Sequence, residues 1–334
     1  MSLLVKRPGL LTTVQDLGRY GAQKYGVIVS GAVDRLALRL ANLLVGNEEN
    51  AACLEMTIIG PEIVLEQPVL IAICGADLSP TLDGNPLPRW KTIAAPGGSV
   101  LKFGKPQEGC RAYLAVGGGL DVAAEMNSRS TYLRAQIGGF QGRALQEGDR
   151  IPLGSASERT ARLQRLLTGA AAADSLAVSR WSVAQELIPA YSPQPVLHVT
   201  AGQEYELFDQ ESQYRFFHEP FTVLAQSDRM GYRLQGSGLQ LAEPKEMLSS
   251  AVTFGTVQVP PDGNPIVLMA DHQTTGGYPK IAQVISTDLP LLAQVNLGGK
   301  VGFQLLDLRE AQQRALAQQA ALRTLQLGLR QLVH

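Results

Sequence analysis

The chain has 334 residues, a length that allows two separate hydrophobic cores. Hydrophobic residues make up 45% of it and charged residues 18%, which is typical of a globular protein and excludes a disordered one. With 29 basic and 30 acidic residues the formal net charge is -1, so no electrostatic attraction to nucleic acid or to a membrane surface is expected.

The first half is expected to consist mainly of short strands. Glycine (34 residues) and proline (19 residues) are abundant and mark turns between them. Strand-like runs lie at 63–65, 69–73 and 113–116, with turns at 83–86 and 96–98. The apolar residues of 33–45 recur at helical spacing, so this segment is predicted to be a helix with Asp34 in its first turn and Gly46 after its end.

The chain changes character at about residue 155. Residues 1–155 are predicted to be a β-rich N-terminal lobe, and residues 156–195 a linker with some helix that ends in a proline-rich stretch. Strands return at 196–199, 221–225, 253–259, 266–270 and 281–285, which places a second lobe at 196–307. Residues 308–334 are rich in Ala, Gln, Leu and Arg and are predicted to form a helix for packing or partner contact.

The cysteines and the N-terminus indicate a cytoplasmic protein. Cys53, Cys74 and Cys110 lack CxxC spacing, so neither a disulfide framework nor a zinc site is predicted, and we expect small buried residues in a reducing compartment. No signal peptide is expected, because the first residues show no charged leader before an apolar core. No stretch approaches the length of a membrane span.

Several familiar catalytic motifs are missing from the sequence. It contains no GxxxxGK[ST], GxGxxG or GxSxG motif, and its histidines form neither HxH nor HExxH. A Walker-type ATP site, a nucleophile-elbow hydrolase and a dedicated metal site are therefore not expected. The chain also has no biotin attachment site of the Met-Lys-Met type.

Residues 271–280, Asp-His-Gln-Thr-Thr-Gly-Gly-Tyr-Pro-Lys, are the most informative stretch, and they lie between two apolar runs expected to be strands. Glycines let backbone N–H groups approach a ligand, and the stretch also offers hydroxyls and opposite charges. These groups come from Asp271, Thr274, Thr275, Gly276, Gly277, Tyr278 and Lys280. They suit an anionic or carbonyl-bearing small molecule; the alternative is a glycine-rich hairpin turn. If 270–272 are extended, Asp271 and His272 point to opposite faces and Asp271 serves the site.

Two clusters in the first half are further candidates. Gln15, Asp16 and Arg19 lie within five positions, and the alternative to a binding role is a surface turn with a weak Asp–Arg pair. Arg129 is flanked by hydroxyls, including Ser130, and can clamp a carboxylate or phosphate; the alternative is an N-cap and loop.

Two further clusters lie in the second half. Arg229 and Arg233 are four residues apart, so their guanidinium groups can converge on one anion. The alternative is a solvated pair with Asp228 neutralising one arginine. Residues 258–263 are predicted to be a structural turn before the strand that leads to Asp271.

Together these segments resemble the allophanate hydrolase subunit 2 group, the biotin-dependent carboxyltransferase family of KipA type, whose bacterial members include the C subunit of 5-oxoprolinase. The matching segments are 15–21, 30–34, 128–131, 228–231, 258–260 and 273–279. Two positions depart from the family pattern: Asn127 stands where Gly is frequent, and His272 where Arg is frequent. The loss of the arginine puts an anion-binding role for position 272 in doubt.

The resemblance implies a mainly β fold with two β-rich lobes, few helices and a cyclophilin-like barrel in the C-terminal lobe. It implies an ATP-dependent opening of 5-oxo-L-proline to L-glutamate, together with a KipI-type partner (the B subunit of 5-oxoprolinase) and a LamB/YcsF-type partner (the A subunit). The chain is then inactive without its partners, and ATP is bound by the complex. Alternatives are biotin-dependent carboxyl transfer to urea or a similar amide, and non-enzymatic regulation of a sensor histidine kinase.

Residue roles follow as a hypothesis from the chemistry of a phosphorylated lactam. Asp271 is the base or the acceptor of the lactam N–H, with Tyr278 orienting it. Arg229, Arg233 and Lys280 bind anions, and the backbone of 276–277 lines the reacting carbonyl. The remaining substrate-binding candidates are Gln15, Asp16, Arg19, Arg129, Ser130, Thr274 and Thr275.

Overall fold

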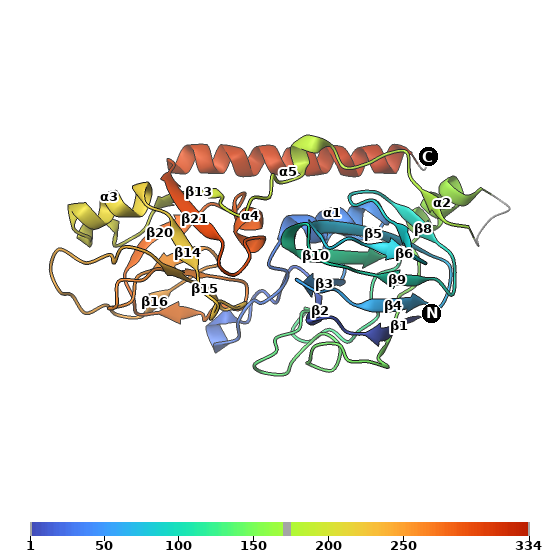
Figure 1. Cartoon of the computed structure of the whole chain (residues 1–334), viewed down its shortest axis with the longest axis horizontal. Helices are drawn as coiled ribbons and strands as arrows, with labels where there is room; N and C mark the ends of the chain where they lie inside the picture. The colour runs from blue at the N-terminus through green and yellow to red at the C-terminus, as the bar shows by residue number, and fades with distance from the viewer. Residues whose placement is uncertain (1, 170–174, 333–334) are drawn as a thin grey trace. The chain divides into compact units, whose positions relative to one another are not determined.

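The computed structural model describes residues 2–169 and 175–332 (Figure 1). Two compact units share the described chain, each with its own hydrophobic core. Unit 1 contains the described residues of Met1–Arg19, Asp34–Ile188 and Ala320–His334, and unit 2 those of Tyr20–Val33 and Pro189–Gln319. The predicted lobe ranges 1–155, 156–195, 196–307 and 308–334 stay a prediction of domain organisation.

Unit 1 is built on two six-stranded sheets. The first has the order β11 (Arg150–Pro152), β1 (Ser2–Arg7), β4 (Glu62–Leu65), β9 (Val100–Lys102), β6 (Thr81–Leu82), β7 (Asn85–Pro86). The second has the order β12 (Ala177–Val178), β8 (Ile93–Ala95), β5 (Val69–Asp77), β10 (Glu108–Val116), β3 (Cys53–Thr57), β2 (Leu11–Gln15). Apolar residues of both sheets, such as Leu3 and Ile63 of the first and Leu54 and Leu114 of the second, form one core. The core forms between the sheets because successive side chains of a strand point to opposite faces, so each sheet can turn one apolar face toward the other.

Helix α1 (Arg35–Leu44) packs against β5 and β10 of the second sheet (Figure 1). The predicted helix at 33–45 is thus confirmed, with Asp34 just before it as the N-cap. The Asp34 carboxylate accepts a hydrogen bond of 2.9 Å from the backbone N–H of Ala37, which satisfies a donor that the first turn leaves open. Helix α2 (Glu158–Thr168) lies in the predicted linker and begins after Ser157, whose hydroxyl accepts from the N–H of Thr160. A short 3-10 helix, η2, covers Gln185–Leu187.

Unit 2 is a closed seven-stranded barrel, which confirms the predicted barrel and the mainly β fold. Its strand order is β13 (Val196–Ala201), β20 (Lys280–Val284), β17 (Thr256–Gln258), β18 (Ile266–Leu268), β15 (Gly231–Gln235), β14 (Phe221–Val223), β21 (Lys300–Leu305). Strands β13 and β21 pair in parallel. A separate two-stranded ribbon, β16 (Ser250–Ala251) with β19 (Thr275–Gly276), lies outside the barrel. This ribbon carries the centre of the 271–280 segment.

The helices of unit 2 are short except for the last. They are η1 (Gln23–Tyr25), η3 (Tyr205–Leu207), α3 (Gln210–His218) and α4 (Leu289–Ala293), followed by α5 (Leu308–Gln331), whose residues from Ala320 onward count with unit 1. Phe216 of α3 stacks on Phe303 of β21 with ring centroids 4.4 Å apart, which fixes α3 on the barrel. The predicted helix in the tail is confirmed by α5. No described helix is both long and apolar enough to cross a membrane.

Candidate functional site

Asp271 follows β18 in a tight turn. The N–H of His272 donates to the carbonyl of Met269 at 3.1 Å, so the chain turns here and is not extended. Asp271 and His272 are both buried, at 5% and 7% exposure. The two side chains were expected on opposite faces only if residues 270–272 were extended. These residues form a turn, so strand alternation does not apply to them.

A buried ion pair fixes the Asp271 carboxylate. Arg229 donates through Nε to Oδ2 at 2.9 Å and through Nη2 to Oδ1 at 3.1 Å, and the backbone N–H of Asp271 donates to the Arg229 carbonyl at 2.7 Å. Both side chains are only 7% exposed. A bidentate pair of this kind is geometrically rigid. The structure thus brings Arg229 of the predicted arginine cluster and the 271–280 segment into direct contact.

Residues Ser30 and Gly31 complete this network within unit 2. Ser30 Oγ donates to Asp271 Oδ1 at 2.7 Å, and Arg229 Nη2 donates to the Gly31 carbonyl at 2.6 Å. Ser30 has φ 57° and Gly31 φ 93°, so two consecutive residues are left-handed and the chain turns sharply toward the barrel. Ser30 was not among the predicted site residues, although the 30–34 segment contributed to the family resemblance.

Arg233 does not share the environment of Arg229. It lies on β15 and is exposed, whereas its neighbours Tyr232 and Leu234 are buried in the barrel. Strand alternation therefore turns Arg233 to the outside, and the two arginines were wrongly expected to share a site. Asp228 caps the turn, because its Oδ1 accepts from the N–H of Met230 at 2.8 Å.

Lys280, at the start of β20, is buried against Glu204. Its Nζ lies 3.2 Å from Oε2 and 3.4 Å from Oε1, and its backbone N–H donates to Oε2 at 2.9 Å. The two side chains are 9% and 12% exposed. Nothing near Glu204 in the sequence marks it as a partner, because the pair joins residues that are far apart in the chain.

The glycine-rich part of the segment borders a cavity of about 600 Å³ in unit 2. Gly277, Tyr278 and Pro279 form part of its wall, together with Pro244, Pro260 and Pro261. The side chains of Lys245 and Glu246 supply charges. A cavity of this size, with apolar walls and a few polar groups, is in the range of small-molecule sites.

Thr274 and Thr275 serve the ribbon. The carbonyl of Thr274 accepts from the N–H of Val252 at 3.2 Å, and Thr275 is exposed on β19 opposite Ala251. Thr275 and Gly276 are thus held by strand pairing. The segment is therefore part of a two-stranded ribbon, as in the hairpin alternative, and it also borders a cavity, as in the binding interpretation.

A pair of amides lies beneath the ribbon. Gln258 ends β17 at 1% exposure, and its Oε1 lies 3.5 Å from Nε2 of Gln273. A Cβ at Gly276 would lie 2.3 Å from Gln258 Nε2, so the glycine is needed for the amide to fit. The 258–263 segment was predicted to be only a structural turn, and this amide was not foreseen as a site group.

In unit 1, the 15–19 and 128–131 clusters meet. The Asp16 carboxylate accepts from both Ser128 Oγ and Ser130 Oγ, and from the N–H groups of Arg129 at 2.6 Å and Gly18 at 2.8 Å. Asp16 is 2% exposed, so the alternative of a weak surface pair does not describe it. Hydroxyl and backbone donors together stabilise this buried carboxylate.

The neighbours of Asp16 extend this network. Arg19, fully buried, donates through Nη2 to the carbonyl of Ser130 at 2.7 Å. Gln15 Nε2 donates to the carbonyl of Thr131 at 3.1 Å, whereas the Arg129 side chain is exposed and its Nε reaches the carbonyl of Val122 at 2.9 Å. The five predicted residues of unit 1 therefore hold one loop against β2.

Asn127 stands in a turn that needs left-handed backbone. Met126 has φ 52° and Asn127 φ 62°, between the bridge partners Glu125 and Ser128. Asn tolerates this region better than other residues with a Cβ. This backbone conformation also suits glycine, the residue that the resemblance led us to expect at this position.

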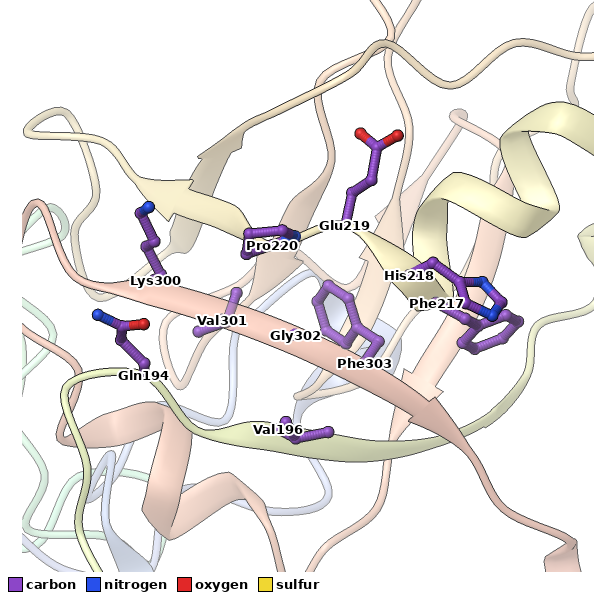
Figure 2. A pocket seen from close by; sticks show the side chains of 10 residues that line it. All are labelled: Gln194, Val196, Phe217, His218, Glu219, Pro220, Lys300, Val301, Gly302 and Phe303. Carbon is purple, nitrogen blue, oxygen red and sulfur yellow. The ribbon is translucent and has the colours of Figure 1, made fainter.

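A second pocket of unit 2, of about 260 Å³, lies on the outside of the barrel beside β21 (Figure 2). Val196 and Phe303 supply apolar surface, and Lys300 and Glu219 supply charges. It contains none of the predicted site residues. Lys300 is exposed, so this groove lacks the buried polar groups of the ribbon region.

The cysteines of the described ranges lie in the interior of unit 1. All three cysteines are buried, as expected, and burial raises the pKa of the Cys53, Cys74 and Cys110 thiols. Among the described residues no group of three or more His, Cys, Asp or Glu side chains is arranged to hold a metal ion.

Comparisons with known proteins agree with this architecture. The family model "Carboxyltransferase domain, subdomain A and B" matches residues 25–305. The chain is 42% identical to the C subunit of 5-oxoprolinase from Haemophilus influenzae over 90% of this chain and 89% of that protein. It is 41% identical to the corresponding C subunit from Escherichia coli over 92% of this chain and 93% of that protein.

Larger proteins contain a similar part. The urea amidolyase of Saccharomyces cerevisiae is 32% identical over 95% of this chain but only 17% of its own length. The crystal structure of the Kluyveromyces lactis urea amidolyase matches 97% of this chain with a TM-score of 0.87 and 28% identity, and the chain spans 20% of that protein. The urea carboxylase structure from the same yeast matches with the same TM-score and identity over 29% of its length.

Proposed function

The chain belongs to the carboxyltransferase domain family, subdomains A and B, and from this we propose that it is one component of an ATP-dependent 5-oxoprolinase. The observation that supports this most is the similarity to two proteins named as the C subunit of 5-oxoprolinase, at 41% and 42% identity over nearly the full length of both chains. Such a name implies a complex with further subunits. We infer that these are a KipI-type and a LamB/YcsF-type protein, and that the chain is inactive without them.

The proposed reaction opens the lactam of 5-oxo-L-proline to L-glutamate, coupled to hydrolysis of ATP to ADP and phosphate. A lactam carbonyl is a poor electrophile, and phosphorylation of its oxygen makes the carbon open to attack by water. The site then has to bind carboxylate and phosphate groups and to exclude bulk water. The cavity beside Gly277 and Tyr278 supports this proposal by its size and by its position next to the 271–280 segment.

The fixed Asp271 carboxylate is proposed to act as the base or as the acceptor of the lactam N–H. Its oxygens already accept from Arg229 and Ser30, which holds the group in one orientation. Lys280 is proposed to bind an anion, with its ammonium placed by Glu204. Because both buried cations already have a carboxylate partner, we propose that ATP is bound in the complex by further groups.

One assay tests the proposal. The chain is mixed with its two partners, and glutamate release from 5-oxo-L-proline is measured with and without ATP. Release that depends on ATP and on all the subunits is the expected result. Absence of release from the complete, assembled mixture would contradict it. Full activity of both Asp271→Asn and Lys280→Ala complexes would remove the proposed roles of these two residues.

Carboxyl transfer from biotin is the second candidate. It is supported by the likeness to the urea carboxylase structure, which extends over 97% of this chain. The same mixture is therefore given urea and carboxybiotin, and loss of the carboxyl group from carboxybiotin is measured. Transfer in this arm without glutamate release in the first would favour the second candidate.

A further inference from the structure

The Gln258 amide is exceptional among the polar groups of the barrel. Its Nε2 is buried and has no hydrogen-bond partner within residues 2–169 and 175–332. Its Oε1 has only a long contact of 3.5 Å with Gln273 Nε2. A buried donor without an acceptor destabilises a fold, so native structures keep such groups rarely and for a reason.

The residues around the Gln258 amide indicate why its donor is kept without a partner. Val257 points into the barrel core, so Gln258, the next residue on β17, points outward toward the ribbon. After a register shift that leaves Ile281 without a partner on β17, Gln258 is the Cα partner of Lys280, so the two residues are neighbours on the barrel wall. An amide donor and a cation are therefore neighbours here, and both are suited to an oxygen acceptor.

The ribbon covers this part of the barrel wall. It is held by two register pairs, Ser250 with Gly276 and Ala251 with Thr275. A two-stranded ribbon of this length is marginally stable by itself. One residue farther along each chain, Val259 and Gly277 line the 600 Å³ cavity. The amide is therefore next to the Gly276 backbone, and the residues that follow Gln258 and Gly276 in the chain line the cavity.

We propose that Gln258 is a substrate-binding residue, and that its Nε2–H donates to a carbonyl or carboxylate oxygen of the ligand when the β16–β19 ribbon moves off the barrel. The identity of the ligand, 5-oxo-L-proline, rests on the proposed function. Gly276 is glycine because a side chain there would displace the amide. The ligand supplies the acceptor that the closed chain lacks.

The test uses Gln258→Met, which keeps the length of the side chain and removes the unsatisfied donor. In the reconstituted complex its KM for 5-oxo-L-proline is expected to rise about 10- to 100-fold, the effect of one hydrogen bond to a charged or carbonyl oxygen. Its thermal midpoint is expected to stay the same or to rise by about 2 to 4 °C, because a buried polar group without a partner has been removed.

Gln283→Met is the matched control. Gln283 lies on β20 of the same barrel, and its amide is fully used, with Nε2 donating to Phe254 and Val284 carbonyls and Oε1 accepting from Thr253 and Thr256. This variant is expected to lose stability and to keep its KM. An unchanged KM in Gln258→Met overturns the proposal, and so does an equal rise of KM in both variants.

Gly276→Ala tests independently whether the Gln258 amide binds substrate or only packs against the ribbon. Its Cβ would lie 2.3 Å from Gln258 Nε2, so this variant should lose both stability and substrate binding. In Gln258→Ala/Gly276→Ala the clash is gone, and stability should recover while KM stays high. Recovery of both would show that the amide is only a packing group and would overturn the proposal.

The wild type separates the two hypotheses. If the complete wild-type complex neither binds nor opens 5-oxo-L-proline, the proposed function fails, and urea replaces 5-oxo-L-proline in the same series. Hydrogen exchange of residues 250–251 and 275–276 with and without ligand reports on the ribbon. Exchange unaffected by a bound ligand would contradict its movement.

Discussion

At the scale of single residues, the network around Asp271 links polar groups from three distant parts of unit 2. Ser30, Arg229 and Asp271 come from separate segments, and each hydrogen bond among them is buried. Removal of one partner from a buried ion pair leaves the other charge without compensation, which is far more costly than the loss of a surface pair. Loss of one member of the network is therefore expected to destabilise the fold, whatever the part of the network in chemistry.

Asp271→Asn is expected to lower the free energy of unfolding by about 3 kcal/mol, because the Arg229 charge stays buried without its carboxylate. Ser30→Ala removes one neutral donor and is expected to lower it by about 1 kcal/mol. Urea denaturation of the purified chain measures both. Wild-type stability of Asp271→Asn would show that Arg229 finds another partner.

At the scale of elements, the sequence predicts the regular parts of the fold well. Helical spacing locates α1, composition locates α5, and apolar runs locate β4, β5, β10 and five of the barrel strands (β13, β14, β17, β18 and β20), because buried segments need apolar side chains. Strands β15 and β21 were not predicted. Strand ends are less well predicted: 253–259 was expected to be extended, whereas β17 covers Thr256–Gln258. Turn hydrogen bonds before the strand, such as that from Thr253 N–H to Thr256 Oγ1, delay its start.

Contacts between distant segments are the part that the sequence does not reveal. The 271–280 segment stands out by its composition, yet the sequence around its partner Glu204 is unremarkable, and the matching segment at 30–34 gives no sign that Ser30 contacts Asp271. A single sequence carries no period or spacing for a pair that only the barrel closure brings together. The misplacement of Arg233 has the same origin, because the start of β15 decides which arginine turns inward.

The N-cap of α3 gives a pH-dependent prediction at this scale. Asp209 accepts from the N–H of Ser212 at 2.6 Å, and this hydrogen bond lowers the pKa of its carboxyl. Asp209→Ala is expected to lower the free energy of unfolding by about 1 kcal/mol at pH 7. Asp209→Asn keeps an acceptor and should lie close to the wild type.

The sign of the pH effect follows from the lowered pKa. A carboxyl group that is more acidic in the folded than in the unfolded chain stabilises the fold above its unfolded pKa of about 4, and this stabilisation is lost as the pH falls through the folded pKa. The difference between wild type and Asp209→Ala should therefore shrink below about pH 4 in thermal melts. A constant difference down to about pH 2 would mean that the charge of the cap plays no part.

At the scale of the whole molecule, each unit has its own core. Leu114→Ala in unit 1 and Phe216→Ala in unit 2 both remove fully buried side chains, and each is expected to lower the stability of its unit by about 3 to 5 kcal/mol. Hydrogen exchange followed by mass spectrometry should locate the first effect in β5 and β10 and the second in α3 and β21. Uniform loss of protection in both units would show one cooperative fold.

Unit 2 is discontinuous along the chain, since residues 20–33 belong to it while the residues on both sides belong to unit 1. A truncated polypeptide that begins at Pro189 would therefore lack Ser30, Gly31 and the core residue Val33. Such a fragment should recover these bonds when a synthetic peptide of residues 20–33 is added in trans. Protease sites inserted on both sides of residues 20–33 would allow this stretch to be cut free. The rate at which the cut peptide dissociates would then measure how tightly Asp271 and Arg229 bind it.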